Sequence, residues 1–249
     1  MPIRTHLFKT LANLEYLEAG SGKVILLLHG LGSRSTAYKQ VINQLTQSYH
    51  VYAPSLHFSL HGQSTSTIED YTSLLNEFIR SKALKDITVI GNSFGGGIAL
   101  KLAESNNKIA RLVLADSAGL PIHYTFTQFL YFLLRKTLHE LKYVSQLPLL
   151  MHLVRDFLLF FLKSLPQFAQ LKKAFDIMSG KELVEFQRIR IPTLLVWGTQ
   201  DEIFSPEYAK HLHSKLSNSE LIFLEGNHDF VLFNHTSFCR AVDKWIGKK

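Results

Sequence analysis

One short segment of the sequence has the composition of a nucleophile turn. Residues Gly91–Gly95 read Gly-Asn-Ser-Phe-Gly, and they separate the apolar run Ile87–Gly91 from a segment with helical periodicity. At such a strand–helix junction this pattern holds the serine on a strained turn, with its hydroxyl exposed above a sheet. Glycine is required because a side chain at position 91 or 95 would collide with the crossing strand or helix. The segment therefore predicts Ser93 as a nucleophile; the alternative is a structural turn whose serine only caps the helix.

A serine hydroxyl is a poor nucleophile unless a base lies nearby, itself oriented by a carboxylate. In proteins with this turn the acid and then the histidine follow the serine along the chain. Asp201 comes after the buried run Thr193–Trp197, and His228 comes after the run Glu220–Leu224. We expect both loops at the carboxyl end of a parallel sheet, which is also where Ser93 lies. The sequence therefore predicts Ser93 as nucleophile, His228 as base and Asp201 as orienting acid.

Other acids and histidines compete for these roles. Asp116 follows the apolar run Leu112–Ala115 and could orient the base from a different strand, although we favour Asp201. Asp229 is adjacent to the predicted base. Among the twelve histidines, only His228 follows the last predicted strand in a glycine-containing loop. The remaining competitors lie on or near predicted helices: Asp243, His211, His213 and His235.

Two backbone amides are predicted to bind the oxyanion that an attacked carbonyl would form. One is the amide of Phe94, which begins a helix and points toward developing negative charge. The second belongs to Leu31, in the turn that follows the run Val24–His29, where Gly30 lets the backbone turn tightly. His29 is expected to support this loop through hydrogen bonds rather than to react.

The composition limits the class of protein. The chain has 249 residues, of which 46% are hydrophobic and 19% charged, as in an ordinary globular domain. The net charge of +7 is spread without a block of five like charges, so a nucleic-acid-binding arm is not expected. A single cysteine, Cys239, excludes an internal disulfide and a cysteine-based metal site and favours a reducing compartment. Neither a signal peptide in Met1–Gly20 nor a membrane span in Ser117–Leu134 is predicted, so we expect a cytoplasmic protein.

Short apolar runs alternate with helix-period segments, which predicts an α/β fold with a mostly parallel sheet. An earlier strand at Leu14–Leu17 is expected to be antiparallel and at the sheet edge. The other predicted strands are Val24–His29, His50–Pro54, Ile87–Gly91, Leu112–Ala115, Thr193–Trp197 and Glu220–Leu224. The predicted helices are Thr36–Leu45, Ile68–Ser81, Phe94–Ser105, Pro206–Leu216 and Thr236–Ile246.

The alternation of strands and helices breaks between about Leu120 and Arg190. This stretch has no strand-like run, and its helical segments are Phe126–Tyr143, Leu149–Leu162 and Gln167–Met178. It is too long for one crossover between parallel strands. We therefore predict a core made of residues 1–119 and 191–249, with a helical cap inserted at 120–190.

With these motifs in order, the chain resembles the α/β-hydrolase superfamily across nearly its whole length. The matching segments are His29–Gly32, Gly91–Gly96, Trp197–Asp201 and Gly226–His228. The resemblance implies an eight-stranded sheet flanked by helices, with the helical lid after the sixth strand. It also implies a Ser93–His228–Asp201 triad that needs no metal and no organic cofactor.

Within the superfamily, the turn at Ser93 is similar to that of carbon–carbon hydrolases that cleave ring-fission products. Those enzymes commonly carry tryptophan directly after the base, where this chain has Asp229. We therefore predict a serine hydrolase that cleaves carboxylic esters through an acyl-enzyme on Ser93. One alternative is carbon–carbon hydrolysis of a vinylogous diketo acid, and another is a non-catalytic ligand receptor on the same fold.

The predicted cap suggests an apolar substrate. Between Leu120 and Ser179 it holds eight of the eighteen phenylalanines, and seven basic against three acidic residues. Apolar faces edged with basic residues are typical of a lid over an acyl pocket, or of one resting on an anionic membrane surface. We therefore expect a hydrophobic small-molecule ester and, as a further hypothesis, a transient membrane contact of the cap. The alternative for any one phenylalanine is packing against the core. The predicted substrate-binding residues are Gly30, His123, Phe126 and Phe129.

Overall fold

The computed structural model describes residues 2–8, 14–56, 67–140, 151, 172, 174–179 and 184–248. Its sheet has eight strands in the order β1-β2-β4-β3-β5-β6-β7-β8. The pairs β1–β2 and β2–β4 are antiparallel, and the pairs from β4 to β8 are parallel. The strands are β1 (Arg4–Phe8), β2 (Leu14–Gly20), β3 (Lys23–Leu28), β4 (Tyr49–Pro54), β5 (Ile87–Asn92), β6 (Ile109–Ala115), β7 (Thr193–Gly198) and β8 (Ser219–Leu224). The predicted α/β class is confirmed.

The prediction that Leu14–Leu17 forms the sheet edge is wrong. This segment belongs to β2, which is antiparallel as predicted but lies between β1 and β4. The outer strand β1 has a weak pattern of apolar residues in the sequence, because a strand at the sheet edge needs one buried face at most. Its Leu7 is 55% exposed, so apolar residues there do not mark a buried face.

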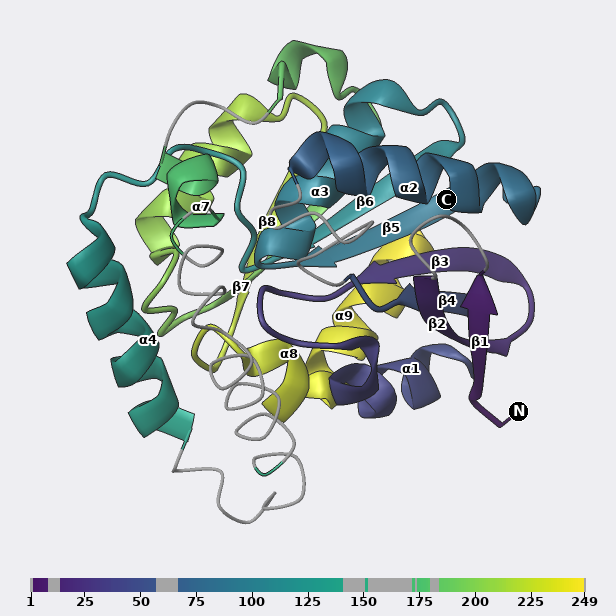
Figure 1. Cartoon of the computed structure of the whole chain (residues 1–249), viewed down its shortest axis with the longest axis horizontal. Coiled ribbons are helices and arrows are strands. Elements are labelled where there is room, and N and C mark those ends of the chain that lie inside the picture. The colour runs from purple at the N-terminus through teal and green to yellow at the C-terminus, as the bar shows by residue number, and fades with distance from the viewer. Residues whose placement is uncertain are drawn as a thin grey trace.

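Helices cover both faces of the sheet, and their described bounds are η1 (Ser35–Tyr38), α1 (Lys39–Leu45), α2 (Ile68–Ser81), α3 (Phe94–Ser105), α4 (Phe126–Glu140), η3 (Phe186–Arg188), α7 (Pro206–Lys215), α8 (Phe230–Phe233) and α9 (His235–Ile246). Successive strand residues point to opposite faces. In β3, Leu26 and Leu28 join the hydrophobic cluster under α2, α3 and α7, whereas Ile25 and Leu27 join the one under α1, α8 and α9 (Figure 1).

Local capping explains where two of the helices begin. The Thr67 hydroxyl accepts from the Asp70 N–H while the Asp70 carboxylate accepts from the Thr67 N–H, a reciprocal cap that fixes the start of α2. At α7, the Ser205 hydroxyl accepts from the Tyr208 N–H, and Pro206 takes the first helical position, where a missing N–H costs nothing. Both starts agree with the sequence prediction.

The stretch between β6 and β7 contains α4, a helical segment at 174–179 and η3. None of its described residues joins the sheet. In Figure 1, α4 lies at the left of the molecule, on the same side of the view as the label of β7. The predicted helix Leu149–Leu162 and most of Gln167–Met178 lie outside the described residues. The division into core and cap thus stays a prediction.

No helix within the described ranges is both long enough and apolar enough to span a membrane.

Candidate active site

Ser93 lies in the turn between β5 and α3, in a backbone conformation that favours glycine. Its φ is +53° and its ψ is −124°, which strains a residue with a side chain. Two backbone hydrogen bonds hold the turn: the Ser93 N–H donates to the Ala115 carbonyl, and the Ser93 carbonyl accepts from the Ala118 N–H, each at 3.0 Å. The Ser93 side chain makes no capping bond to α3. The structural-turn alternative therefore lacks its defining hydrogen bond.

The two glycines around Ser93 let α3 pack directly on the strands. A methyl group at Gly91 would lie 2.6 Å from the carbonyl oxygen of Gly95. A methyl group at Gly95 would lie 2.5 Å from the carbonyl oxygen of His29, at the end of β3. These separations are too short for any side chain, so the steric reason inferred from the sequence is the one that the structure shows.

The side chains of Ser93, His228 and Asp201 form a continuous hydrogen-bonded series. His228 Nε2 is 2.9 Å from Ser93 Oγ, and His228 Nδ1 lies 2.9 and 3.0 Å from the two Asp201 oxygens. His228 and Asp201 are buried. Because a carboxylate only accepts, Nδ1 carries the hydrogen and Nε2 keeps the lone pair that faces the Ser93 hydroxyl. This tautomer can remove a proton from Ser93.

Asp201 is held by the chain around it. Its Oδ1 also accepts the N–H groups of Ile203 and Phe204, at 2.7 and 2.9 Å. The aromatic ring of Phe204 lies 5.6 Å, centroid to centroid, from the imidazole of His228. The carboxylate and imidazole planes are thereby fixed before any substrate binds.

The loops after β7 and β8 lie against each other because Gly198 has no side chain. A methyl group there would be 2.7 Å from the Asn227 carbonyl oxygen and 2.8 Å from that of Gly226. The Gln200 N–H also donates to the Gly226 carbonyl at 2.9 Å. This close approach brings residues 201 and 228, from different strands, to one point.

Asp116 is a second carboxyl group at this point. It is 0% exposed, and its Oδ1 accepts the Gly198 N–H at 2.8 Å. Burial and the charge of neighbouring Asp201 raise the pKa of Asp116 well above its usual range. The Asp116 Oδ2 atom is buried and has no hydrogen-bond partner among the described residues.

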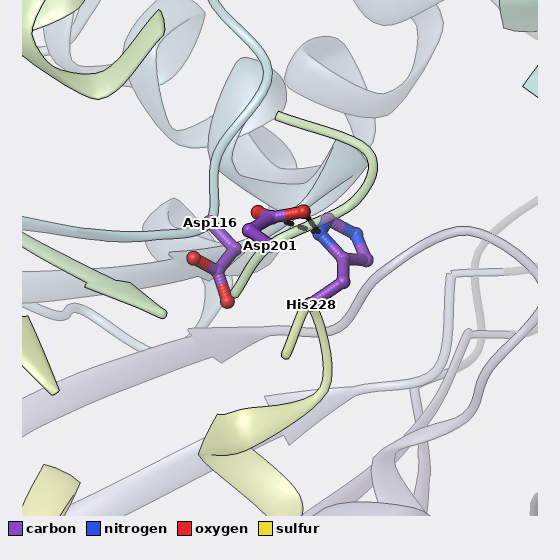
Figure 2. Close-up of side chains that lie close together, drawn as sticks. All are labelled: Asp116, Asp201 and His228. Atoms are coloured by element: carbon purple, nitrogen blue, oxygen red, sulfur yellow. Dashed lines mark hydrogen bonds and ion pairs between the residues drawn. The ribbon is translucent and has the colours of Figure 1, made fainter. Parts of the chain in front are cut away.

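Figure 2 shows Asp116, Asp201 and His228 converging, with dashed bonds between Asp201 and the imidazole. One nitrogen or carboxylate oxygen from each residue lies within 4.8 Å of the others. Three such atoms at this spacing could ligate a metal ion. However, Asp201 already accepts hydrogen bonds from His228, Ile203 and Phe204. The donor set is therefore matched to a proton relay rather than to metal ligation.

The turn after β3 is supported by His29. His29 Nε2 accepts the Leu56 N–H at 2.8 Å, so its Nδ1 carries the hydrogen and donates to the Gly30 carbonyl, also at 2.8 Å. Both ring nitrogens are used in holding the loop, and His29 is buried. This is the supporting role that the sequence suggests for His29.

Gly30 connects that turn to the nucleophile turn. A methyl group at Gly30 would lie 3.1 Å from Ser93 Cβ. The Gly30 N–H donates to the Tyr38 hydroxyl at 3.3 Å, and this hydroxyl donates to Asn92 Oδ1 at 2.5 Å. The side-chain Nδ2 of Asn92 donates a hydrogen bond to the Ala115 carbonyl oxygen at 3.0 Å. The backbone before Leu31 is thus tied to the residue before Ser93.

Sequence reasoning missed Tyr38 and Asn92 as part of this arrangement. In the sequence, Asn92 is the residue between Gly91 and Ser93 in the turn, and Tyr38 lies within the predicted helix Thr36–Leu45. Their hydrogen bond joins positions 54 apart in the chain, and no local pattern signals a contact at that separation.

A small hollow with room for about one water molecule, a cavity volume of about 10 Å³, lies beside Gly30 and Phe94. Apolar side chains supply much of its wall: Leu31, Leu56, Phe94 and Ile98. The two amides predicted to bind an oxyanion belong to residues of the same wall.

The predicted substrate-binding residues of the cap lie elsewhere among the described contacts. Phe129 is buried in an aromatic cluster with Tyr124 and Phe175, with ring centroids 6.4 and 5.6 Å away. Phe126 joins the same cluster, 6.3 Å from Phe129. His123 is exposed. The structure brings none of the three into a described contact with Ser93, and their role in binding stays a prediction.

Comparisons with known proteins place the chain in one family. Residues 25–241 match the family model described as "Alpha/beta hydrolase family". The chain is 28% identical over 261 residues to Lipase 1 of Psychrobacter immobilis, covering 92% of this chain and 77% of the lipase.

One solved structure and one further sequence relative are also similar to the chain. The solved structure of a thermophilic esterase from Thermogutta terrifontis superposes on this chain with a TM-score of 0.78 and 18% sequence identity. The match covers 100% of this chain and 99% of the esterase. A 2-hydroxy-6-oxo-6-(2'-aminophenyl)hexa-2,4-dienoic acid hydrolase of Metapseudomonas resinovorans is 30% identical over 117 residues, covering 43% of this chain and 40% of that hydrolase.

Proposed function

The chain belongs to the alpha/beta hydrolase family, and from that premise we propose that it is a serine hydrolase of carboxylic esters with an apolar acyl or alkyl part. Hydrolase activity agrees with the lipase and esterase relatives. The observation that carries the proposal is the series Ser93 Oγ–His228 Nε2 at 2.9 Å and His228 Nδ1–Asp201 Oδ2 at 2.9 Å.

The first half of the proposed reaction acylates Ser93. Ser93 Oγ attacks the ester carbonyl carbon while His228 Nε2 takes the hydroxyl proton. Asp201 stabilises the imidazolium that forms and keeps Nδ1 protonated. The tetrahedral intermediate collapses when His228 gives the proton to the leaving alcohol, which leaves an ester between the acyl group and Ser93.

The second half releases the acid. His228 takes a proton from water, and the resulting hydroxide attacks the acyl carbon. Collapse of the second tetrahedral intermediate returns the proton to Ser93 Oγ and frees the carboxylic acid. In both halves the amides of Leu31 and Phe94 are proposed to bind the oxyanion; the contact of Gly30 with Ser93 supports this placement. Loss of one such donor in serine hydrolases costs about 3–4 kcal/mol of transition-state stabilisation.

The apolar substrate preference is supported by the phenylalanine-rich stretch 120–179 and by the apolar side chains of Leu31, Leu56 and Phe94 beside the proposed oxyanion amides. The partial match to a carbon–carbon hydrolase keeps hydrolysis of a vinylogous diketo acid as the second candidate.

The test is turnover of p-nitrophenyl esters of increasing acyl length, measured beside a ring-fission diketo acid. We expect ester hydrolysis in the unmodified protein, covalent labelling of Ser93 by a fluorophosphonate, and loss of both in Ser93→Ala with the fold retained. Full ester hydrolysis by Ser93→Ala would refute the mechanism. Faster turnover of the diketo acid than of every ester would favour the second candidate. A protein that hydrolyses neither would point to a ligand receptor.

The outer face of α4 supports the proposal of transient contact with an anionic membrane surface. Tyr131, Leu134 and Leu138 are each 58% exposed, and their spacing places them on one side of the helix. Exposed Arg135 lies between them. We expect co-sedimentation with vesicles that contain phosphatidylserine, weakened by salt and by Leu134→Ser. Absence of binding at low salt would exclude the contact.

A further inference from the structure

Two side chains of α4 contact the residues that directly follow Asp201 and His228, Lys136 through an ion pair and His139 through a hydrogen bond. Lys136 Nζ lies 2.5 Å from Asp229 Oδ2, and His139 Nδ1 lies 2.7 Å from Glu202 Oε1. Glu202 follows Asp201 in the loop after β7, and Asp229 follows His228 in the loop after β8. One helix therefore contacts both loops that carry the proposed acid and base.

The contacts of Lys136 with Asp229 and of His139 with Glu202 belong to a single face of α4. Lys136 and His139 are three residues apart, which places them one above the other on a helix. The opposite face carries the exposed side chains Tyr131, Leu134 and Leu138. The pairs thus lie between α4 and the sheet domain, where a shift of the helix would pull on both loops.

Burial makes these contacts different from ordinary surface pairs. The side chains of Lys136 and Asp229 are 18% and 14% exposed, and those of His139 and Glu202 are 14% and 5% exposed. By contrast, Lys172 and Asp176, a pair within the cap, are 55% and 53% exposed. Buried ion pairs add little net stability because desolvation offsets their attraction, although they can specify one geometry.

A further contact joins the same parts of the molecule. The Tyr124 hydroxyl, just before α4, donates to the Ile203 carbonyl at 3.1 Å. The Ile203 N–H in turn donates to the Asp201 carboxylate at 2.7 Å. The loop of the proposed acid is thereby attached to the cap side at two successive residues, Glu202 and Ile203.

We propose that Lys136 and His139 are positioning residues, which hold the loops of Asp201 and His228 in the geometry needed for ester hydrolysis. The proposal rests on the proposed function of Ser93. Each side chain acts on the neighbour of a relay residue, Lys136 on Asp229 and His139 on Glu202. Without them the distances between Ser93, His228 and Asp201 would be sampled over a wider range, and the cost would fall on the chemical step rather than on substrate binding.

The kinetic test compares matched substitutions in the cap. Lys136→Met and His139→Ala should each lower kcat by about tenfold or more, because small misplacements of catalytic groups are costly, while KM changes by less than about threefold. Lys136→Arg and His139→Gln, which keep a donor toward the same carboxylate, should restore most of kcat. Lys172→Met, which breaks the exposed pair, should leave kcat unchanged.

The second measurement does not depend on activity. Hydrogen exchange reports the Ile203 and Phe204 amides, which donate to Asp201, and the Leu232 amide, which donates to the Asp229 carbonyl. In Lys136→Met and His139→Ala these amides should exchange faster, and in Lys172→Met they should not. If Lys136→Met does not fold, Lys136→Met combined with Asp229→Asn removes both buried charges and serves in its place.

Unchanged kcat and unchanged exchange in Lys136→Met and His139→Ala would overturn the proposal, as would a loss that the conservative variants do not restore. A loss of equal size in Lys172→Met would also overturn it, because any disturbance of the cap would then suffice. Failure of the proposed function is a separate result: the unmodified protein would not hydrolyse esters, while the exchange measurement would still decide whether Lys136 and His139 hold the two loops.

Discussion

Asp116 and Asp201 place two buried carboxyl groups with oxygens within 4.8 Å of each other. Asp201 accepts from the imidazole and two backbone amides. Burial and the charge of Asp201 raise the pKa of Asp116 well above its usual range. Two acids from neighbouring strands thus lie in different environments, and environment rather than residue type sets the pKa of a carboxyl group.

Asp116→Asn should therefore change how stability depends on pH. The unfolded chain loses the Asp116 proton above about pH 4, whereas the folded protein keeps it to higher pH. The unfolding free energy of the unmodified protein thus falls with rising pH over that window, by at most about 1.4 kcal/mol per pH unit from this group. Asparagine is neutral throughout, so the variant gains relative stability as the pH rises above about 4. Urea denaturation at several pH values measures this; a pH-independent difference would contradict a raised pKa of Asp116.

Asp201→Asn should reduce kcat by about 10⁴-fold while the protein stays folded. An amide at this position would present N–H groups or a single oxygen to His228 Nδ1, so the tautomer that leaves Nε2 unprotonated is no longer favoured. The measurement is p-nitrophenyl ester turnover together with circular dichroism. Asp176→Asn, which changes an exposed acid between β6 and β7, is the matched control and should keep full activity. If Asp201→Asn also kept it, another group would have to orient the base.

Tyr38→Phe should lower both stability and kcat. The hydroxyl bridges the Gly30 N–H and Asn92 Oδ1 in a buried site, and removing it leaves two unsatisfied polar groups at a cost of about 1–3 kcal/mol. The loop that carries the Leu31 amide also loses its tie to the nucleophile turn. Tyr49→Phe is the control: its hydroxyl donates to Asp243, at 2.7 Å, in a different part of the fold. It should reduce the melting temperature but not kcat, and equal kinetic losses in both variants would argue against the tie.

Gly95→Ala should prevent stable folding or lower the unfolding free energy by more than about 4 kcal/mol. The added methyl group would lie 2.5 Å from the His29 carbonyl oxygen and 2.6 Å from that of Leu28, and backbone atoms of β3 cannot move without disturbing the sheet. Denaturant unfolding of the purified variant is the measurement. A loss below 1 kcal/mol would mean that α3 is less tightly packed on β3 than the structure shows.

Much of the fold could be predicted from local patterns, and particular residues show why. The predicted helix Ile68–Ser81 has the observed bounds of α2, and its periodicity is that of a helix with one buried face. Buried strands such as β7 and β5 show as continuous apolar runs because helices cover both of their faces. The outer strand β1 could not be found this way, since an exposed edge selects little.

The site was predictable where each role has a local signature. Ser93 has its glycines, and Asp201 and His228 follow strands at one end of the sheet. No such signature exists for three other features: the raised pKa of Asp116, the Tyr38–Asn92 hydrogen bond, and the contacts of Lys136 and His139 on α4. They depend on distances between residues far apart in the chain, as in the 63 positions that separate His139 from Glu202.

The backbone at Ser93 has a consequence for attempts to make this protein more heat-resistant. Its φ of +53° lies in a range that glycine enters without penalty and serine does not. A selection that rewards only survival at high temperature would therefore favour replacing the hydroxyl of Ser93, the proposed nucleophile. Thermostable isolates from such a screen would need to be checked at codon 93 before anything else, because the fold gains there what the reaction loses.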